Sequence, residues 1–90
     1  MISDEHWQYE AKRINETADS IKHSQGYAMS LDGEPHRWTN QERAILTASL
    51  GIKLGLRGNV LREHILFGVA SGDYSKELAD GLLRKLDLQG

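Results

Sequence analysis

The sequence predicts an all-α fold: a small four-helix domain with a long amphipathic helix at its amino terminus, an irregular connection and three shorter helices. Three observations support this prediction. Apolar residues recur at helical spacing from Trp7 to Ile21, helix-capping patterns stand before the later helices, and the single proline falls in the connection. Because 90 residues bury only a thin core, residues 1–90 are expected to form one domain.

The first helix is expected within residues 1–26. Ser3 is a suitable N-cap, and the acidic residues after it suit the positive end of a helix dipole. The apolar residues step by four and three along one narrow stripe: Trp7, Ala11, Ile14, Ala18 and Ile21. Such a stripe is typical of a helix that packs against one partner helix. Gly26 is expected to end the helix as its carboxy-terminal cap.

Residues 27–38 are expected to form the irregular connection. Apolar and small residues alternate from Tyr27 to Leu31, and Asp32-Gly33 is a turn signal. Pro35 disfavours a regular helix, so the segment has room for a short hairpin.

Residues 39–90 are expected to hold three helices. Thr39 and Glu42 have the spacing of a capping box, which predicts a helix from Asn40 to Gly58. Two later pairs each place a glycine able to turn left-handed before an N-cap residue: Gly58-Asn59 and Gly72-Asp73. They predict a third helix over Val60–Ser71 and a fourth over Tyr74–Asp87.

Two glycine pairs, Gly51/Gly55 and Gly68/Gly72, are each spaced by four residues, so each pair should leave one helix face bare. Close approach of a neighbouring helix would compensate the roughly 1 kcal/mol that a glycine costs inside a helix. The third helix is apolar on more than one side and is therefore expected to be the buried centre of the domain, wrapped by the second and fourth helices.

Catalysis, metal binding and membrane insertion find no support in the sequence. Cysteine is absent, and the pairs His6/Glu10 and Asp19/His23 supply two metal ligands each, fewer than a zinc site needs. No nucleophile elbow or phosphate-binding loop is present. The amino terminus lacks the pattern of a secretory signal, and no apolar run is long enough for a bilayer. We therefore expect a soluble cytoplasmic protein with no enzymatic activity, cofactor or metal.

The sequence instead favours a small regulatory or inhibitory protein that binds another protein. A thin core without disulfides is often completed by a second copy, so a homodimer is expected. Aromatic residues beside arginine are frequent anchors of protein interfaces. The candidate partner-binding residues, which would form an acidic and aromatic face of the first helix and the connection, are Trp7, Tyr9, Arg37 and Trp38.

A DNA-binding transcriptional regulator is the alternative. Gly51 and Gly55 have the spacing of the small residue and the turn glycine of a helix-turn-helix, with leucines around them. The stretch, and KLGLRGN most of all, resembles the helix-turn-helix of phage repressor-type regulators. The resemblance implies that Arg57, Asn59 and Arg62 face the major groove, where Arg62 would contact guanine and Arg57 a phosphate.

Two features count against this alternative. His64 stands where the helix-turn-helix pattern has a buried aliphatic residue. The third helix is also apolar on more than one side, whereas a helix that reads DNA needs a broad polar face.

Overall fold

The computed structural model describes residues 4–32 and 38–88, and gives the backbone but not the side chains of residues 24–32. Every regular element in these ranges is a helix: α1 (Asp4–Asp32), α2 (Asn40–Lys53), α3 (Gly58–Ala70) and α4 (Lys76–Lys85). The all-α fold with a long first helix and three shorter ones is confirmed.

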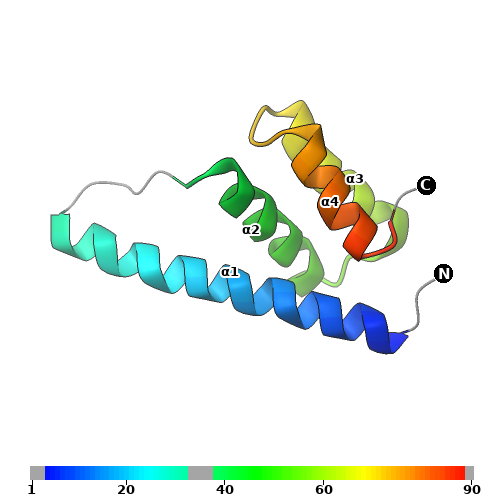
Figure 1. Ribbon diagram of the computed structural model, residues 1–90, viewed down its shortest axis with the longest axis horizontal. Coiled ribbons are helices and arrows are strands. Elements are labelled where there is room, and N and C mark those ends of the chain that lie inside the picture. Colours follow the sequence, from blue (N-terminus) through cyan, green and yellow to red (C-terminus); the bar gives the residue numbers. More distant parts are fainter. Residues whose placement is uncertain (1–3, 33–37, 89–90) are drawn as a thin grey trace.

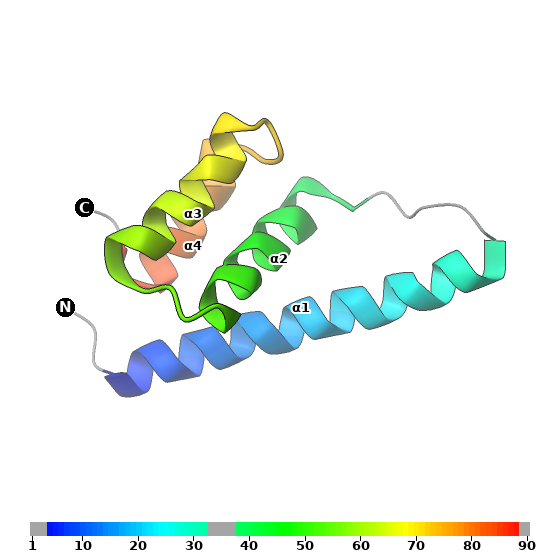
Figure 2. The same cartoon turned by 180° about the vertical axis from the view of Figure 1, so that it is seen from behind.

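The helix α2 lies at the centre of the arrangement. It contacts α1 on one side and both α3 and α4 on the other, whereas α1 has its main contacts with α2 alone. In Figures 1 and 2, α1 is a long rod along one edge of the molecule, and α2, α3 and α4 gather on the same side of it. The expectation that the third helix would be the centre is therefore wrong. Small residues of α2 (Ala44, Ala48 and Gly51) are buried and let its neighbours approach.

The predicted stripe of α1 is confirmed, but its predicted end is not. Trp7, Ala11, Ile14 and Ala18 are buried, and Ile21 is half-buried. The helix continues past Gly26 to Asp32, so residues 27–32 are helical and not part of a hairpin. Of the rest of the predicted connection, residues 33–37 lie outside the described residues, and Trp38 is not helical. Glycine permits a helix to end but does not force it, and the first residue that forbids helix here is Pro35.

Among the described side chains, polar contacts join α1 to α2 at Asn15 and at Asp19. The Ser49 hydroxyl, which is buried, donates to Asn15 Oδ1 at 2.8 Å. The Lys53 ammonium donates to Asp19 Oδ1 at 2.7 Å, and this hydrogen bond holds the pKa of Asp19 below its ordinary value of 3.8. These contacts fix the register of α1 along α2.

The capping box that begins α2 is confirmed. The Glu42 amide donates to Thr39 Oγ1 at 3.1 Å, and the Thr39 amide donates to Glu42 Oε1 at 2.8 Å. The helix ends at Lys53 and not at Gly58, because Gly55 adopts a φ of 84°. The Leu56 amide then donates back to the Gly51 carbonyl at 3.0 Å, which closes the carboxy-terminal cap.

The other helix boundaries follow the predicted glycines more closely than the predicted caps. Gly58 and Gly72 have positive φ, as predicted. The residues after them are not the N-caps, however: Arg57 occupies the N-cap position of α3, and Ser75 caps α4 by accepting a hydrogen bond from the Leu78 amide. A serine two positions beyond Asp73 is an equally good cap, and the tertiary fold decides between them.

The core is thin and rich in alanine. The large apolar side chains with less than 2% of their surface exposed are Leu61, Ile65 and Leu86. Tyr74 is buried beside them and donates a hydrogen bond from its hydroxyl to the Ile65 carbonyl. Burial raises the pKa of the Tyr74 phenol. Because alanines fill much of this core, several larger apolar side chains remain on the surface.

In each glycine pair, the first glycine permits close packing and the second ends a helix. The expectation that each pair leaves one helix face bare is therefore wrong. A Cβ on Gly51 would lie 2.7 Å from atoms of His64 and Leu61, and a Cβ on Gly68 would overlap the Tyr74 ring. These first members permit close packing, as predicted. The second members, Gly55 and Gly72, have open space around them and serve to end α2 and α3.

The expectation that α3 is buried on most of its circumference is wrong. Leu61, Ile65 and Gly68 are buried along one line of the helix. On another side, Val60 is 58% exposed and Phe67 is 71% exposed. The helix α3 has its main contacts with α2 and α4. Because α1 packs against α2 instead, it does not cover the exposed side of α3.

Candidate functional site

The most exposed large apolar side chains of α2 and α3 form a set that we call the apolar face: Leu50, Leu54, Val60 and Phe67. Their exposed fractions are 50%, 65%, 58% and 71%, respectively. Leu54, the C-cap residue of α2, follows Leu50 by one turn, and Val60 and Phe67 are two turns apart on α3. Each pair therefore follows one line of its helix.

The contact of His64 with α2 shows that the Leu50/Leu54 pair and the Val60/Phe67 pair both lie beside the contact between α2 and α3. It falls between Val60 and Phe67 on α3, and its Nε2 is 2.8 Å from the Thr47 carbonyl oxygen of α2. Thr47 is three residues before Leu50, so it neighbours Leu50 on α2. The buried residues Ala48 and Leu61 lie on the other side of this contact, toward the core. The apolar face thus flanks the α2–α3 contact on the side away from the core.

A hollow at the start of α2 extends the apolar face. It has a volume of about 240 Å³ and is lined by Trp38, Arg43, Leu46, Thr47 and Asp73. Trp38 is 41% exposed there, and Leu46 lies one turn before Leu50. An exposed indole beside an arginine is thus continuous with the exposed leucines of α2.

Of the four residues that the sequence nominates for partner binding, the structure describes three, and it separates them. Trp7 is buried in the core, and Arg37 lies outside the described residues. Tyr9 is 59% exposed on the side of α1 opposite its buried stripe, where the Arg13 guanidinium lies 5.7 Å from its ring centre. Trp38 stands at the start of α2, on a different element.

Sequence reasoning missed the apolar face because it expected the third helix, which carries Val60 and Phe67, to be the buried centre of the domain. Leucine, valine and phenylalanine at helical spacing are more often buried than exposed. The signal that could have found them is the excess of apolar residues on α3, which carries them on more sides than its neighbours can cover.

The three residues nominated for DNA contact do not lie free on one open ridge. The Arg57 guanidinium lies 4.6 Å from the Trp7 ring centre and 3.5 Å from Asp4 Oδ1, so it engages α1. Arg62 is half-buried, and its Nε is buried without a hydrogen-bond partner among the described residues. Asn59 is exposed. Beside Asn59, the exposed residues of α3 include Val60, Glu63 and Phe67, none of which carries the positive charge that pairs with phosphates.

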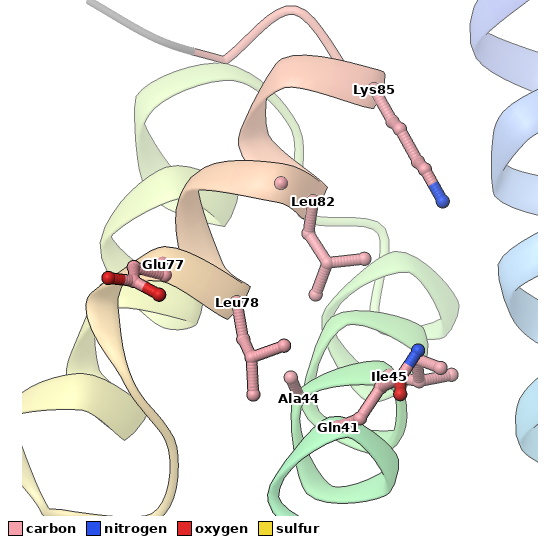
Figure 3. A pocket seen from close by; sticks show the side chains of 8 residues that line it. Gln41, Ala44, Ile45, Glu77, Leu78, Leu82 and Lys85 are labelled. Atoms are coloured by element: carbon pink, nitrogen blue, oxygen red, sulfur yellow. The ribbon is translucent and has the colours of Figure 1, made fainter.

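A second surface feature is a pocket between α2 and α4, which we call the α2–α4 pocket. Figure 3 shows Ala44, Ile45, Leu78 and Leu82 at its apolar floor, with Glu77 and Lys85 toward opposite ends. Gln41 and Gly81 complete the lining, and the volume is about 180 Å³. A smaller hollow of about 70 Å³ shares Ile45, Leu82 and Lys85 with it and is closed by α1 through Glu10, Arg13, Ile14 and Thr17.

Neither a metal site nor a membrane span occurs in the part of the chain that the structure describes. Within residues 4–32 and 38–88, no three histidine or acidic side chains are grouped so that they could hold a metal ion. In the same ranges, no helix combines the length and the apolar character that crossing a bilayer requires. The features that remain for function are the apolar face and the α2–α4 pocket.

Comparison of the chain with models of protein families, with curated proteins and with solved structures gave no match.

Proposed function

We propose that the protein is a non-enzymatic regulatory or inhibitory protein that acts by binding another protein through the apolar face, and that it works as a homodimer. The single observation that carries the partner-binding surface is Phe67, a phenylalanine with 71% of its surface exposed on a regular helix. Aromatic side chains at the centre of an interface are typical binding hot spots.

The size of the apolar face supports this proposal. Each of its four side chains exposes on the order of 100 Å² of apolar surface. A standard interface covers about 800 Å² on each partner, and a little more than half of that area is apolar. With Trp38 and Leu46 beside it, the apolar face supplies about this apolar area.

The rigidity of the supporting helices also favours a binding role. The Gly51 backbone of α2 lies against His64 and Leu61 of α3, and His64 is hydrogen-bonded to Thr47. The four side chains are thus presented by two closely packed helices, and little conformational entropy would be lost on ordering them against a partner.

A binding experiment with one captured protein tests the proposal. A protein captured by the wild-type chain is identified, purified and titrated against wild type and Phe67→Ser. We expect Phe67→Ser to raise the Kd by about 30-fold, the effect of losing a hot spot. Unchanged helix content in circular dichroism would show that both chains are folded.

Tyr9→Ser is the matched control, because Tyr9 is another largely exposed aromatic residue on another side of the molecule. It should leave the Kd unchanged. Loss of binding in Tyr9→Ser with normal binding in Phe67→Ser would instead favour the acidic and aromatic face of α1. Retention of the wild-type chain on duplex DNA, weakened by Arg62→Ala and by salt, would replace the proposal with the DNA-binding alternative.

A further inference from the structure

Gly81 lies in a helix, and no contact within the described chain requires glycine at this position. It lies inside α4, where glycine is less favourable than alanine. Gly51 and Gly68 each have a side chain of another residue against them, whereas a Cβ added to Gly81 would meet nothing within 4 Å. Gly81 lines the α2–α4 pocket and is only partly buried. The missing side chain therefore opens the surface of α4 toward the outside.

Two opposite charges flank Gly81 symmetrically. Glu77 comes four residues before it and Lys85 four residues after it, so both lie on the same side of α4 as Gly81. They are about 12 Å apart along the helix axis. Both are exposed, and neither forms an ion pair with another described residue.

The pattern around Gly81 is complementary to itself. A two-fold axis that passes through Gly81, perpendicular to α4, places Glu77 of one copy against Lys85 of the other, and the reverse pair forms by symmetry. Arg84, which is also exposed, lies next to Lys85 and adds to the positive charge that meets Glu77. At the crossing point the absence of a side chain lets the two helices approach closely.

We propose that two copies of the chain dimerise through α4, which crosses its symmetry mate antiparallel at Gly81, with Glu77 of each copy paired to Lys85 of the other. This inference rests on the homodimer of the proposed function but not on its apolar face. Leu78, at the floor of the α2–α4 pocket, lies on the same side of α4 and is covered in the dimer.

Charge complementarity is the reason to place a second copy here, and not on the apolar face. The four side chains of the apolar face are all uncharged and supply no ionic pattern that would set the register of two copies. The surface of α4 has one acidic and one basic end at equal distances from a glycine, which is what an antiparallel pair of identical helices requires.

Charge reversal in sedimentation equilibrium tests the dimer. The full-length chain is measured over a concentration series at low salt as wild type, Glu77→Lys and Lys85→Glu. Wild type should dimerise, and each single variant should raise the dimer Kd at least tenfold, because like charges then face each other twice. An equimolar mixture of the two variants should dimerise again, since each acidic side chain now meets a basic one on the other chain.

Gly81→Leu provides a second variant that does not depend on charge. A leucine at the crossing separates the two helices and should also raise the dimer Kd at least tenfold, while the open space around Gly81 leaves the fold of each copy intact.

A wild-type chain that stays monomeric at a few hundred micromolar, or a mixture no more dimeric than its components, would overturn the inference. So would a dimer lost in Phe67→Ser but retained in Glu77→Lys, because it would place the second copy on the apolar face. Partner binding measured with Glu77→Lys separates the two proposals: its Kd for the captured protein should match that of wild type whether or not the dimer on α4 exists.

Discussion

Gly68 of α3 and Gly81 of α4 occupy the same kind of backbone in opposite surroundings. The Tyr74 ring lies directly on Gly68, and nothing lies on Gly81. Both glycines carry the same helix penalty, but only at Gly68 does the folded chain itself compensate for it, through the buried ring of Tyr74. The difference shows that a helical glycine can make room for a buried side chain or can leave part of the helix surface bare. The tertiary contacts of the glycine distinguish the two cases.

Gly68→Ala should have the largest effect on stability. The new Cβ overlaps the Tyr74 ring, and overpacking of this kind outweighs the gain in helix propensity. We expect the free energy of unfolding to fall by about 2 kcal/mol, and the Tm by about 10 °C in a thermal melt. In a Tyr74→Leu background the same substitution should be far less damaging. Equal losses in both backgrounds would contradict the packing of Tyr74 on Gly68.

Gly51→Ala should have a smaller effect of the same sign. Its Cβ would approach the Leu61 methyl and the His64 ring at 2.7 Å, and these side-chain ends can shift more easily than the buried Tyr74 ring. We expect urea denaturation to show a loss of about 1 kcal/mol. A His64→Ala background should relieve part of this loss, and a stability gain in the single variant would show that α2 and α3 do not pack closely at Gly51.

Gly81→Ala should have the smallest effect and the opposite sign. Nothing obstructs the new methyl group, so the variant gains helix propensity without a clash. The free energy of unfolding should rise by somewhat less than about 1 kcal/mol. The measurement is best made in a Glu77→Lys background, where the proposed dimer does not contribute. A destabilised variant would mean that Gly81 is needed by the fold of the single chain, and the contrast with Gly68 would disappear.

Sequence reasoning predicted those features that depend on neighbours along the chain. The capping box of Thr39 and Glu42, the left-handed glycines 58 and 72 and the buried stripe of α1 are all present. Each rests on a local hydrogen bond, a local φ or a helical period, which a few consecutive residues determine.

The errors concern features that depend on distant residues. Gly26 lies inside α1, and whether a helix stops at a glycine depends on the residues after it and on the side chains that pack there. Phe67 and Val60 have the composition of core residues, but the position of α1 against α2 leaves no helix to cover them. The candidate site shifted for this reason from Tyr9 and the connection to the apolar face, and Trp38 is the residue beside it among the described candidates for partner binding.

The order of the sequence alone determined that this chain is helical, where α2 begins and which side of α1 is buried, because hydrogen bonds and periodicity act over a few residues. Only the tertiary structure decided which apolar residues remain outside and which glycines are covered. The exposure of a side chain depends on how many other residues surround it in space. When a helix is apolar on several sides, its own sequence does not indicate which side the neighbouring helices will leave exposed.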